Sequence, residues 1–123
     1  SERSRVKRMI DGIPAGKVFN MAGKTTISQY AALLARCRLF IGCDSAGVHI
    51  ASAVETQTAT IYGPSSPKSW APRENGHVVI QKAMDCVPCR EKGCRGSGRS
   101  ECLEKLSVDE VVAVVDPLIA AWG

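Results

Sequence analysis

The sequence predicts an α/β domain, in which a parallel β-sheet is flanked by helices. Short apolar runs alternate with amphipathic stretches, and the connections between them are short. Polar residues typical of ligand binding directly follow one of the apolar runs. The 123 residues, 45% of them hydrophobic, suffice for one domain with its own core, over residues 1–123. No stretch approaches the ~20 apolar residues that cross a membrane.

An amphipathic helix is predicted near the start of the chain, because apolar residues recur there every three or four positions. These residues are Val6, Met9, Ile10 and Ile13. A short strand over residues 17–21 and a loop over residues 22–25 follow. A second helix is predicted from Thr26, because Thr26 and Gln29 have the spacing of a capping box. Since α/β domains usually begin with a strand, we expect at least one element to precede this chain.

Three apolar runs predict the strands of the sheet, over residues 39–42, 58–62 and 78–80. The first of them is expected to be buried on both faces. Between the first two strands, residues 48–54 are small and apolar and predict a tightly packed helix. A last helix is predicted over residues 107–122.

Local signals support this last helix. Ser107 and Glu110 have capping-box spacing, and Leu106 and Val111 are spaced as the hydrophobic staple beside it. The buried face is expected to comprise Val108, Val111, Val112, Val115, Ile119 and Trp122. Pro117 is expected to kink or split the helix, because proline removes one hydrogen bond and clashes with the preceding turn.

A candidate phosphate site, Asp44-Ser45-Ala46-Gly47-Val48-His49, stands where the first apolar strand ends and the next helix begins. Open α/β sheets bind ligands beyond the carboxyl ends of their strands. The small residues leave the backbone accessible, and the free N–H groups at a helix start attract phosphate. His49 can add a further donor nitrogen. From spacing alone, an ordinary helix start with Asp44 as N-cap is equally compatible.

The net charge of +4 is unevenly distributed. Residues 1–38 carry eight Lys and Arg residues against two acidic ones, whereas the remainder is slightly acidic. A basic surface suits phosphorylated small molecules, nucleic acids or anionic lipids. Because only 5% of the residues are aromatic, little is available for base stacking, and no nucleic-acid partner is expected.

Three motifs, in this order along the chain, resemble glycosyltransferase family 9, the ADP-heptose:lipopolysaccharide heptosyltransferases and their relatives. They are Asn20-x-Ala22-Gly23-Lys24-Thr25, Gly42-x-Asp44-Ser45-Ala46-Gly47-x-His49 and Ala59-Thr60-Ile61-Tyr62-Gly63-Pro64-Ser65-Ser66-Pro67. The resemblance covers about residues 1–82 and the final helix. It implies a Rossmann-like parallel sheet flanked by helices, which forms the C-terminal, donor-binding half of a two-domain GT-B glycosyltransferase.

The resemblance also implies roles for individual residues. Those expected at the diphosphate and sugar of the donor are Asp44, Ser45, Ala46, Gly47 and His49. Lys24 and Thr25 would lie near the nucleotide, and Glu2 matches an acidic residue that binds the ribose hydroxyls. Ser65 and Ser66 lie in a loop at the same edge of the sheet, where a plain proline-rich turn and a ligand contact are equally compatible.

The implied reaction is inverting transfer of heptose from ADP-heptose to an acceptor in the lipopolysaccharide inner core. A base must take the proton of the acceptor hydroxyl, and the donor site must stabilise the departing diphosphate. In the family the base is an Asp of the N-terminal domain, so we expect no catalytic residue in this chain and no activity from it alone. The site is expected to need no metal cofactor. The enzyme is expected in the cytoplasm, in peripheral contact with the inner membrane.

Four cysteines form a separate cluster in a loop over residues 85–103. They are Cys86, Cys89, Cys94 and Cys102. Four thiolates at this spacing can hold a structural Zn²⁺; two disulfides, four free thiols, an iron–sulfur cluster and a redox pair are the alternatives. The alternatives to half of a glycosyltransferase are therefore a non-catalytic nucleotide- or phosphate-binding module and a metal-binding domain built on four cysteines. Cys37 and Cys43 adjoin apolar runs and are expected in the core.

Overall fold

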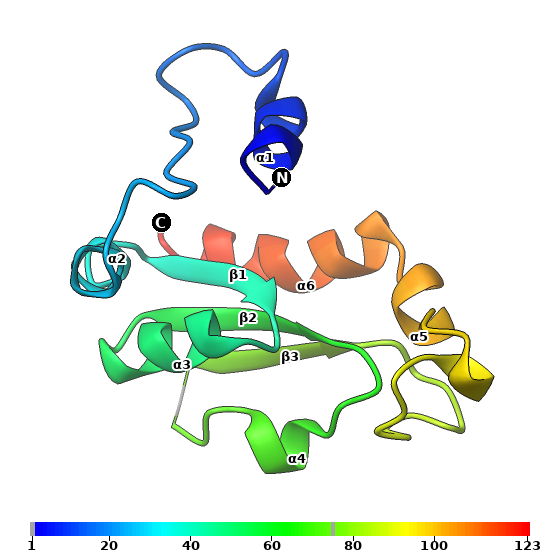
Figure 1. Ribbon diagram of the computed structural model, residues 1–123. Coiled ribbons are helices and arrows are strands. Elements are labelled where there is room, and N and C mark those ends of the chain that lie inside the picture. Colours follow the sequence, from blue (N-terminus) through cyan, green and yellow to red (C-terminus); the bar gives the residue numbers. More distant parts are fainter. Residues whose placement is uncertain (1, 75) are drawn as a thin grey trace.

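The computed structural model describes residues 2–74 and 76–123, and its core is a parallel three-stranded sheet in the order β1-β2-β3 (Figure 1). The strands are β1 (Leu39–Cys43), β2 (Gln57–Tyr62) and β3 (His77–Gln81). The helices are α1 (Glu2–Ile10), α2 (Ile27–Leu34), α3 (Ala46–Ala53), α4 (Pro67–Trp70), α5 (Glu101–Glu104) and α6 (Val108–Ala120), with a short 3₁₀ turn at Cys94–Gly96. The predicted α/β class is confirmed.

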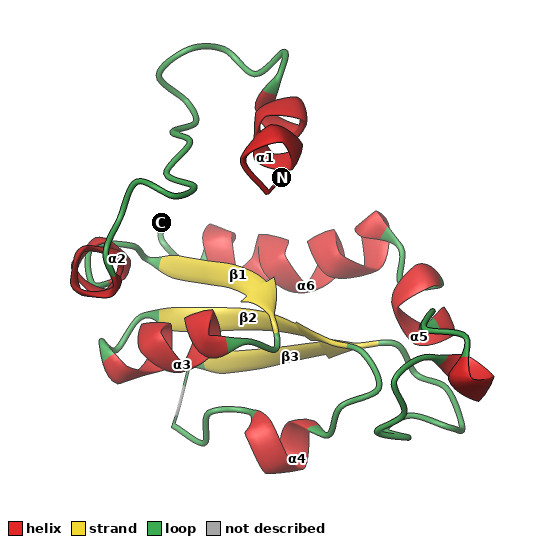
Figure 2. Ribbon diagram, in the orientation of Figure 1, coloured by secondary structure: helices red, strands yellow, loops and turns green. Residues whose placement is uncertain are grey.

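The central strand β2 separates two layers of different character. Ala59 and Ile61 point to the side of α6, where they pack against Val115 in the apolar core. Because successive side chains of a strand point to opposite faces, Thr58, Thr60 and Tyr62 point to the other side. Helix α3 contacts β1 and β2 and covers that second face (Figure 2). The sheet is therefore covered on both faces, as a parallel sheet requires.

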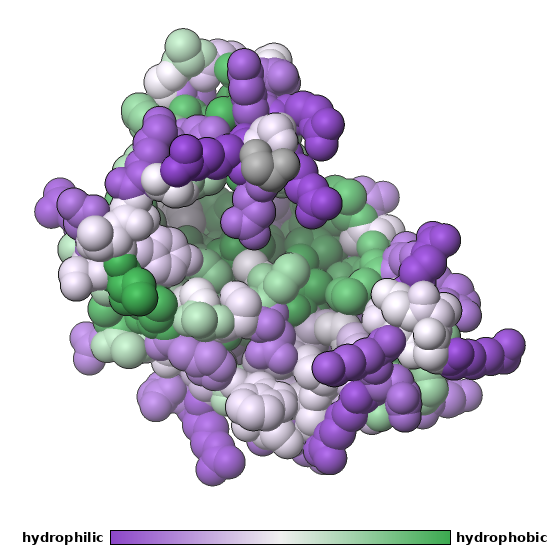
Figure 3. Space-filling view, viewed as in Figure 1, coloured by the Kyte–Doolittle hydropathy of each residue, from purple (hydrophilic) through white to green (hydrophobic). Residues whose placement is uncertain are grey.

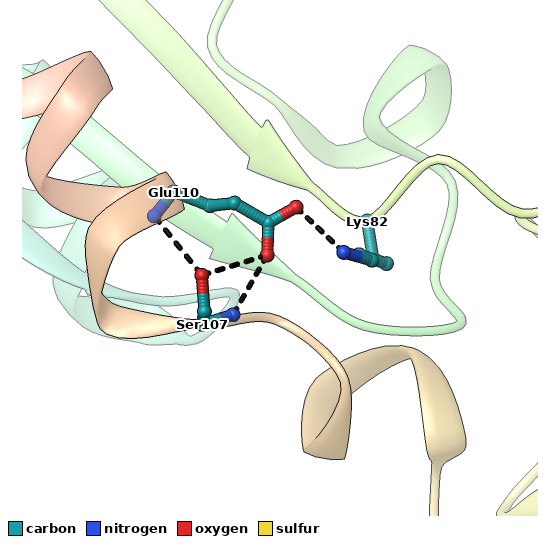
Figure 4. Close-up of polar contacts among 3 residues, drawn as sticks. All are labelled: Lys82, Ser107 and Glu110. Carbon is teal, nitrogen blue, oxygen red and sulfur yellow. Dashed lines mark hydrogen bonds and ion pairs between the residues drawn. The ribbon is translucent and has the colours of Figure 1, made fainter.

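The amino end of α6 is fixed to the end of β3 by a chain of polar contacts (Figure 4). Ser107 and Glu110 form the predicted capping box, with Ser107 Oγ accepting from the Glu110 backbone N–H at 3.2 Å. The Lys82 ammonium, just after β3, donates to Glu110 Oε1 at 2.6 Å. These contacts hold the pKa of Glu110 at about 2, below its ordinary 4.5, with the Lys82 hydrogen bond as the largest cause.

This lowered pKa predicts an acid-dependent stability. Glu110 binds its partners as a carboxylate, so its contribution is complete above pH 4.5 and is lost as the pH falls through about 2. We expect Glu110→Gln to lower the melting temperature at pH 6, and the difference from the parent chain to shrink below pH 4.5. Thermal unfolding followed by circular dichroism at several pH values measures this. A difference that stays constant down to pH 2 would contradict the assignment.

Helix α1 and the segment that follows it stand away from the sheet (Figure 1). No residue of α1 is buried, and the helix ends at Ile10, with Gly12 in the left-handed region at φ +90°. Residues 17–21 form no strand, so that prediction is wrong. A strand is stable only when its backbone groups pair with a neighbour, and among the described residues this segment has no such partner.

Two expectations about burial are also wrong. Strand β1 is an edge strand with Ile41 50% exposed, because only β2 pairs with it within the described chain. Cys37 and Cys43, expected in the core, are both exposed. In Figure 3, apolar side chains gather over the region of β1 and α6, below the arm formed by α1.

Helix α6 differs from its prediction in two respects. It runs as one helix through Pro117, which costs it a single backbone hydrogen bond in its last turns and does not split it. The residues that pack on the sheet are Val111, Val114, Val115 and Leu118. Val108 is 77% exposed, and Val112, Ile119 and Trp122 are exposed too. Apolar residues lie on two faces of the helix, so their periodicity alone predicts the wrong face as the buried one.

Candidate functional site

The predicted phosphate site lies at the carboxyl end of β1. Asp44 directly follows the strand, and Ser45 is the N-cap residue of α3, with extended backbone angles of φ −157° and ψ 178°. The Ser45 side chain makes no capping hydrogen bond to the described residues, and of the first-turn N–H groups that of Val48 donates to the Ser45 carbonyl at 3.3 Å, so the amides of Ala46 and Gly47 have no side-chain cap. This is the arrangement in which a helix start accepts an anion.

Asp44 is held in place by the loop that follows β2. Ser65 Oγ donates to Asp44 Oδ2 at 2.8 Å, and the Asp44 backbone N–H donates to the Ile61 carbonyl at 3.2 Å. One carboxylate oxygen is thus engaged by Ser65. Ser65, which the sequence left open between a turn and a ligand contact, has a third role: it orients Asp44.

The loop itself is fixed by β3 and by the cysteine-rich segment. Gln81 Nε2 donates to the carbonyls of Gly63 at 2.8 Å and Ser65 at 3.0 Å. The Arg90 backbone N–H donates to the Pro64 carbonyl at 2.7 Å. Ser66 is buried as the N-cap residue of the short helix α4. Sequence reasoning missed Gln81, whose role depends on three strand ends meeting at one edge.

A cavity of about 200 Å³ opens between the ends of β1 and β2. Its lining residues are Cys43, Asp44, Ile61, Gly63, Pro64, Ser65 and Leu103. A larger cavity of about 320 Å³, lined by Gln57 and His77 among others, lies at the amino ends of β2 and β3. Because parallel sheets bind ligands at their carboxyl ends, the smaller cavity is the candidate site.

The glycines of the motif make room for two aromatic side chains. A Cβ at Gly42 would lie 2.6 Å from Phe40 Cζ, and a Cβ at Gly47 would lie 3.1 Å from both Phe40 Cζ and the Tyr30 hydroxyl. Phe40 therefore packs beneath the start of α3, and Tyr30 of α2 approaches it. Sequence reasoning missed both aromatics. The glycine two residues after Phe40, on the same face of β1, was the available signal.

Two further side chains complete the site. Tyr62, the last residue of β2, is fully buried, and its pKa is raised first by burial and then by the nearby charge of Asp44. His49 is exposed on α3, where it closes the first turn of the helix. The site therefore combines a buried phenol, a carboxylate at the edge of the sheet and an exposed imidazole on the helix that starts there.

The residues expected at the nucleotide lie on a separate segment. Lys24 and Thr25 follow a turn closed by a hydrogen bond from the Lys24 N–H to the Met21 carbonyl at 3.0 Å. Arg3 Nη2 donates to the Gly23 carbonyl at 3.0 Å, which brings the first turn of α1, with Glu2, next to this turn. The structure thus places the first turn of α1 beside the turn that precedes Thr25, and Thr26 then begins α2, which contacts α3.

The cysteine-rich loop lies against the candidate site. All six cysteines are free thiols. Cys86, Cys89 and Cys94 line one cavity of about 320 Å³, whereas Cys102 is 4% exposed. Burial is the main cause that raises the pKa of the Cys102 thiol. The next residue, Leu103, lies 2.9 Å from where a Cβ of Gly63 would be, so α5 packs on the loop that holds Asp44.

An α/β sheet with a helix start, a small cavity and an oriented carboxylate at its carboxyl edge is the arrangement at which α/β proteins commonly bind phosphates and nucleotides. The family model of glycosyltransferase family 9 (heptosyltransferase) matches residues 1–98. The chain belongs to this family, which confirms the resemblance drawn from the three motifs.

Individual relatives agree with the family. The chain is 36% identical over 115 residues to lipopolysaccharide heptosyltransferase 3 of Escherichia coli K12, covering 93% of this chain and 33% of that protein. It is 30% identical over 103 residues to lipooligosaccharide heptosyltransferase 2 of Campylobacter jejuni serotype O:6, covering 83% and 32%. The chain thus spans about a third of the length of the curated relatives it matches.

A solved structure shares the fold. The structure of E. coli ADP-heptose lps heptosyltransferase II superposes on this chain with a TM-score of 0.74, at 22% identity, over 98% of this chain and 34% of that one. This likeness confirms the predicted Rossmann-like arrangement of a parallel sheet flanked by helices. No helix within residues 2–74 and 76–123 has the length and apolar character needed to cross a lipid bilayer.

Proposed function

We propose that this chain is the donor-binding part of an inverting glycosyltransferase that transfers heptose from ADP-heptose to an acceptor in the lipopolysaccharide inner core. The supporting observation is the free start of α3 beside the oriented Asp44, at the carboxyl edge of the sheet, in a member of the heptosyltransferase family. In this proposal residues 1–123 form a single donor-binding domain, and the acceptor binds to the N-terminal domain of the whole enzyme.

The charges of the site assign the diphosphate and the sugar of the donor to different residues. The amides of Ala46 and Gly47 and the imidazole of His49 are donors suited to the negative diphosphate. Asp44 is a carboxylate and would repel phosphate, but it can accept hydrogen bonds from sugar hydroxyls. Ser65 occupies its Oδ2 atom and Asp44 lines the cavity, so Oδ1 is assigned as the acceptor for the sugar.

The transfer step makes one bond and breaks one. The oxygen of the acceptor hydroxyl bonds to the anomeric carbon of the sugar, while the bond from that carbon to the diphosphate oxygen breaks and its electron pair leaves with ADP. A base in the N-terminal domain takes the hydroxyl proton. The residues of this chain act on the leaving group, because the α3 amides and His49 stabilise its growing negative charge without a metal.

The adenosine is assigned to the first turn of α1 and the turn beside it. Glu2 accepts hydrogen bonds from the ribose hydroxyls, and Lys24 and Thr25 lie beside the nucleotide. The basic side chains of α1 raise the local concentration of the anionic donor. They also favour contact with an anionic lipid surface, which supports an enzyme in the cytoplasm that touches the inner membrane peripherally.

Titration of ADP into the chain tests the donor site. We expect millimolar to high micromolar binding by calorimetry, and shifts of the backbone amide resonances of residues 44–49. Adenosine, which lacks phosphates, is the matched control and should leave those resonances in place. If ADP at millimolar concentration shifts none of them, the donor-site assignment fails.

Transfer itself is measured with the whole enzyme. Incubated with ADP-heptose and a heptose-free inner-core acceptor, it should release ADP and lengthen the acceptor by one sugar. ADP binding without any transfer would instead make the protein a nucleotide-binding module.

A further inference from the structure

We propose that the loop over residues 85–103 is a zinc site, in which the thiolates of Cys86, Cys89, Cys94 and Cys102 bind one ion. This inference stands apart from the proposed transfer reaction, because it concerns what holds the loop in place. The ion would tie the loop to α5, and through α5 to the donor cavity.

The loop lacks an apolar core of its own. Within residues 85–103, all of which the structure describes, only Gly93 and Cys102 are buried. Ordering the backbone costs conformational entropy, which burial of apolar side chains normally offsets. Here that source of stability is missing, so a segment of this length needs another one. A bound metal supplies it in many small cysteine-rich units.

Three of the four cysteines share one cavity, and the fourth directly follows a residue that lines it. The cavity has a volume of about 320 Å³, and its three cysteines are spread over nine positions of the sequence. The fourth, Cys102, follows Glu101, which lines the same cavity. The Glu101 backbone N–H donates to Cys94 Sγ at 3.4 Å, which places the start of α5 directly against the Cys94 thiol. Backbone N–H groups that bond to sulfur orient thiolate ligands in metal sites.

Cys94 stands in a tight turn built for it. Its backbone N–H donates to the Arg99 carbonyl at 2.7 Å, which closes a small loop. Gly93 has φ +91°, and a Cβ there would lie 2.5 Å from the Gly98 nitrogen, so only glycine fits. The backbone around Cys94 is therefore already compact, and it presents the thiol to the shared cavity.

The segment is slightly basic. Residues 85–103 carry Arg90, Lys92, Arg95 and Arg99 against Asp85, Glu91 and Glu101. Positive neighbours lower the cost of deprotonating thiols. They also balance the net negative charge that one Zn²⁺ and four thiolates carry together. A disulfide pair would need none of this charge.

Metal binding requires a movement of side chains. Within residues 2–74 and 76–123, no three histidine, cysteine, aspartate or glutamate side chains already lie close enough together to hold a metal ion. The side chains of Cys86, Cys89 and Cys94 line the cavity and must approach one another to reach the ~2.3 Å zinc–sulfur distance. Cys86 is exposed and Cys89 is half-exposed, so these two side chains have room to turn.

Zinc content of the purified chain tests the proposal. Expressed in zinc-supplemented medium and purified under reducing conditions without chelator, it should contain about one zinc per chain, and X-ray absorption should show four sulfur neighbours at ~2.3 Å. A content below ~0.2 zinc per chain overturns the proposal, because a closed four-ligand site binds one ion. So does a mixed sulfur and oxygen shell with fewer than three sulfurs.

Variants separate this site from adventitious metal. Cys86→Ser replaces an exposed thiol and should reduce bound zinc to less than a fifth, whereas Cys37→Ser, which replaces an exposed thiol outside the loop, should leave it unchanged. Retention of a full zinc by Cys86→Ser overturns the ligand set. Removal of zinc by a chelator should speed amide hydrogen exchange over residues 85–103; unchanged exchange overturns the structural role.

Discussion

We expect His49→Ala to weaken ADP binding by about tenfold to a hundredfold without changing the fold. A hydrogen bond to a charged group contributes about 1.5–3 kcal/mol, and about 1.4 kcal/mol corresponds to a factor of ten in affinity. His49 is exposed on α3, so its side chain can be removed without opening the core. Calorimetric titration of ADP, beside a melting curve of each variant, measures both quantities.

Ser52→Ala is the matched control for this variant. Ser52 lies on the same helix, but at its far end, near Glu74 and His77. The Ser52→Ala variant should bind ADP as the parent chain does. Equal losses of affinity in the two variants would show that α3 as a whole is disturbed, and an unchanged affinity of His49→Ala would remove His49 from the site.

Asp44→Asn distinguishes the sugar from the phosphates. If Asp44 accepts from sugar hydroxyls, the variant should bind ADP at least as well as the parent, because a repelling charge is gone. The same variant should bind ADP-heptose more weakly. The Ser65 hydroxyl can still donate to the amide oxygen, so the loop keeps its position. A loss of ADP affinity would instead place Asp44 at the nucleotide.

Local signals explain which elements the sequence predicts well. Both capping boxes are present as expected, because each rests on side chains three residues apart. In the first, the Thr26 N–H donates to Gln29 Oε1 at 2.9 Å. In the second, the Ser107 N–H donates to Glu110 Oε2 at 2.8 Å. Contacts of this kind form within one turn, so they depend on no other part of the fold.

Burial was harder to predict because it depends on partners. The run at Leu39–Cys43 is apolar enough for a central strand, yet β1 has one paired edge within the described chain. Helix α6 carries valines around much of its surface, and the sheet packs against Val111, Val115 and their neighbours. In both cases the apolar pattern is real, but the sequence does not state which neighbour covers it.

The position of Asp44 at the edge of the sheet follows from the sequence, whereas the residues that support it were missed. A polar block after an apolar run locates the ligand edge of a parallel sheet, and the structure places Asp44 there. The residues that support the site are Ser65, Gln81 and Phe40. Ser65 and Gln81 form hydrogen bonds to residues 21 and 16 positions away, and Phe40 acts through a glycine contact. Such pairs become neighbours only when β1, β2 and β3 align, so they follow from topology and not from local spacing.

We expect Tyr62→Ala to destabilise the chain by about 3–5 kcal/mol, the usual cost of removing a buried aromatic side chain. Among the described residues Tyr62 is the largest fully buried side chain, and it points to the face of β2 that α3 covers. Since small domains are stable by about 5–15 kcal/mol, this loss would leave the chain marginally folded at best. Urea unfolding followed by circular dichroism measures it.

Tyr62→Phe separates the ring from the hydroxyl. Within residues 2–74 and 76–123 the Tyr62 hydroxyl has no hydrogen-bond partner, and leaving a buried polar group unpaired costs about 1–3 kcal/mol. The phenylalanine variant should therefore be at least as stable as the parent. A substantial loss of stability in Tyr62→Phe would contradict an unpaired hydroxyl. If Tyr62→Phe instead keeps its stability but loses ADP affinity, the hydroxyl belongs to the donor site, because a polar group that weakens the empty fold is retained only when a ligand completes its hydrogen bonding.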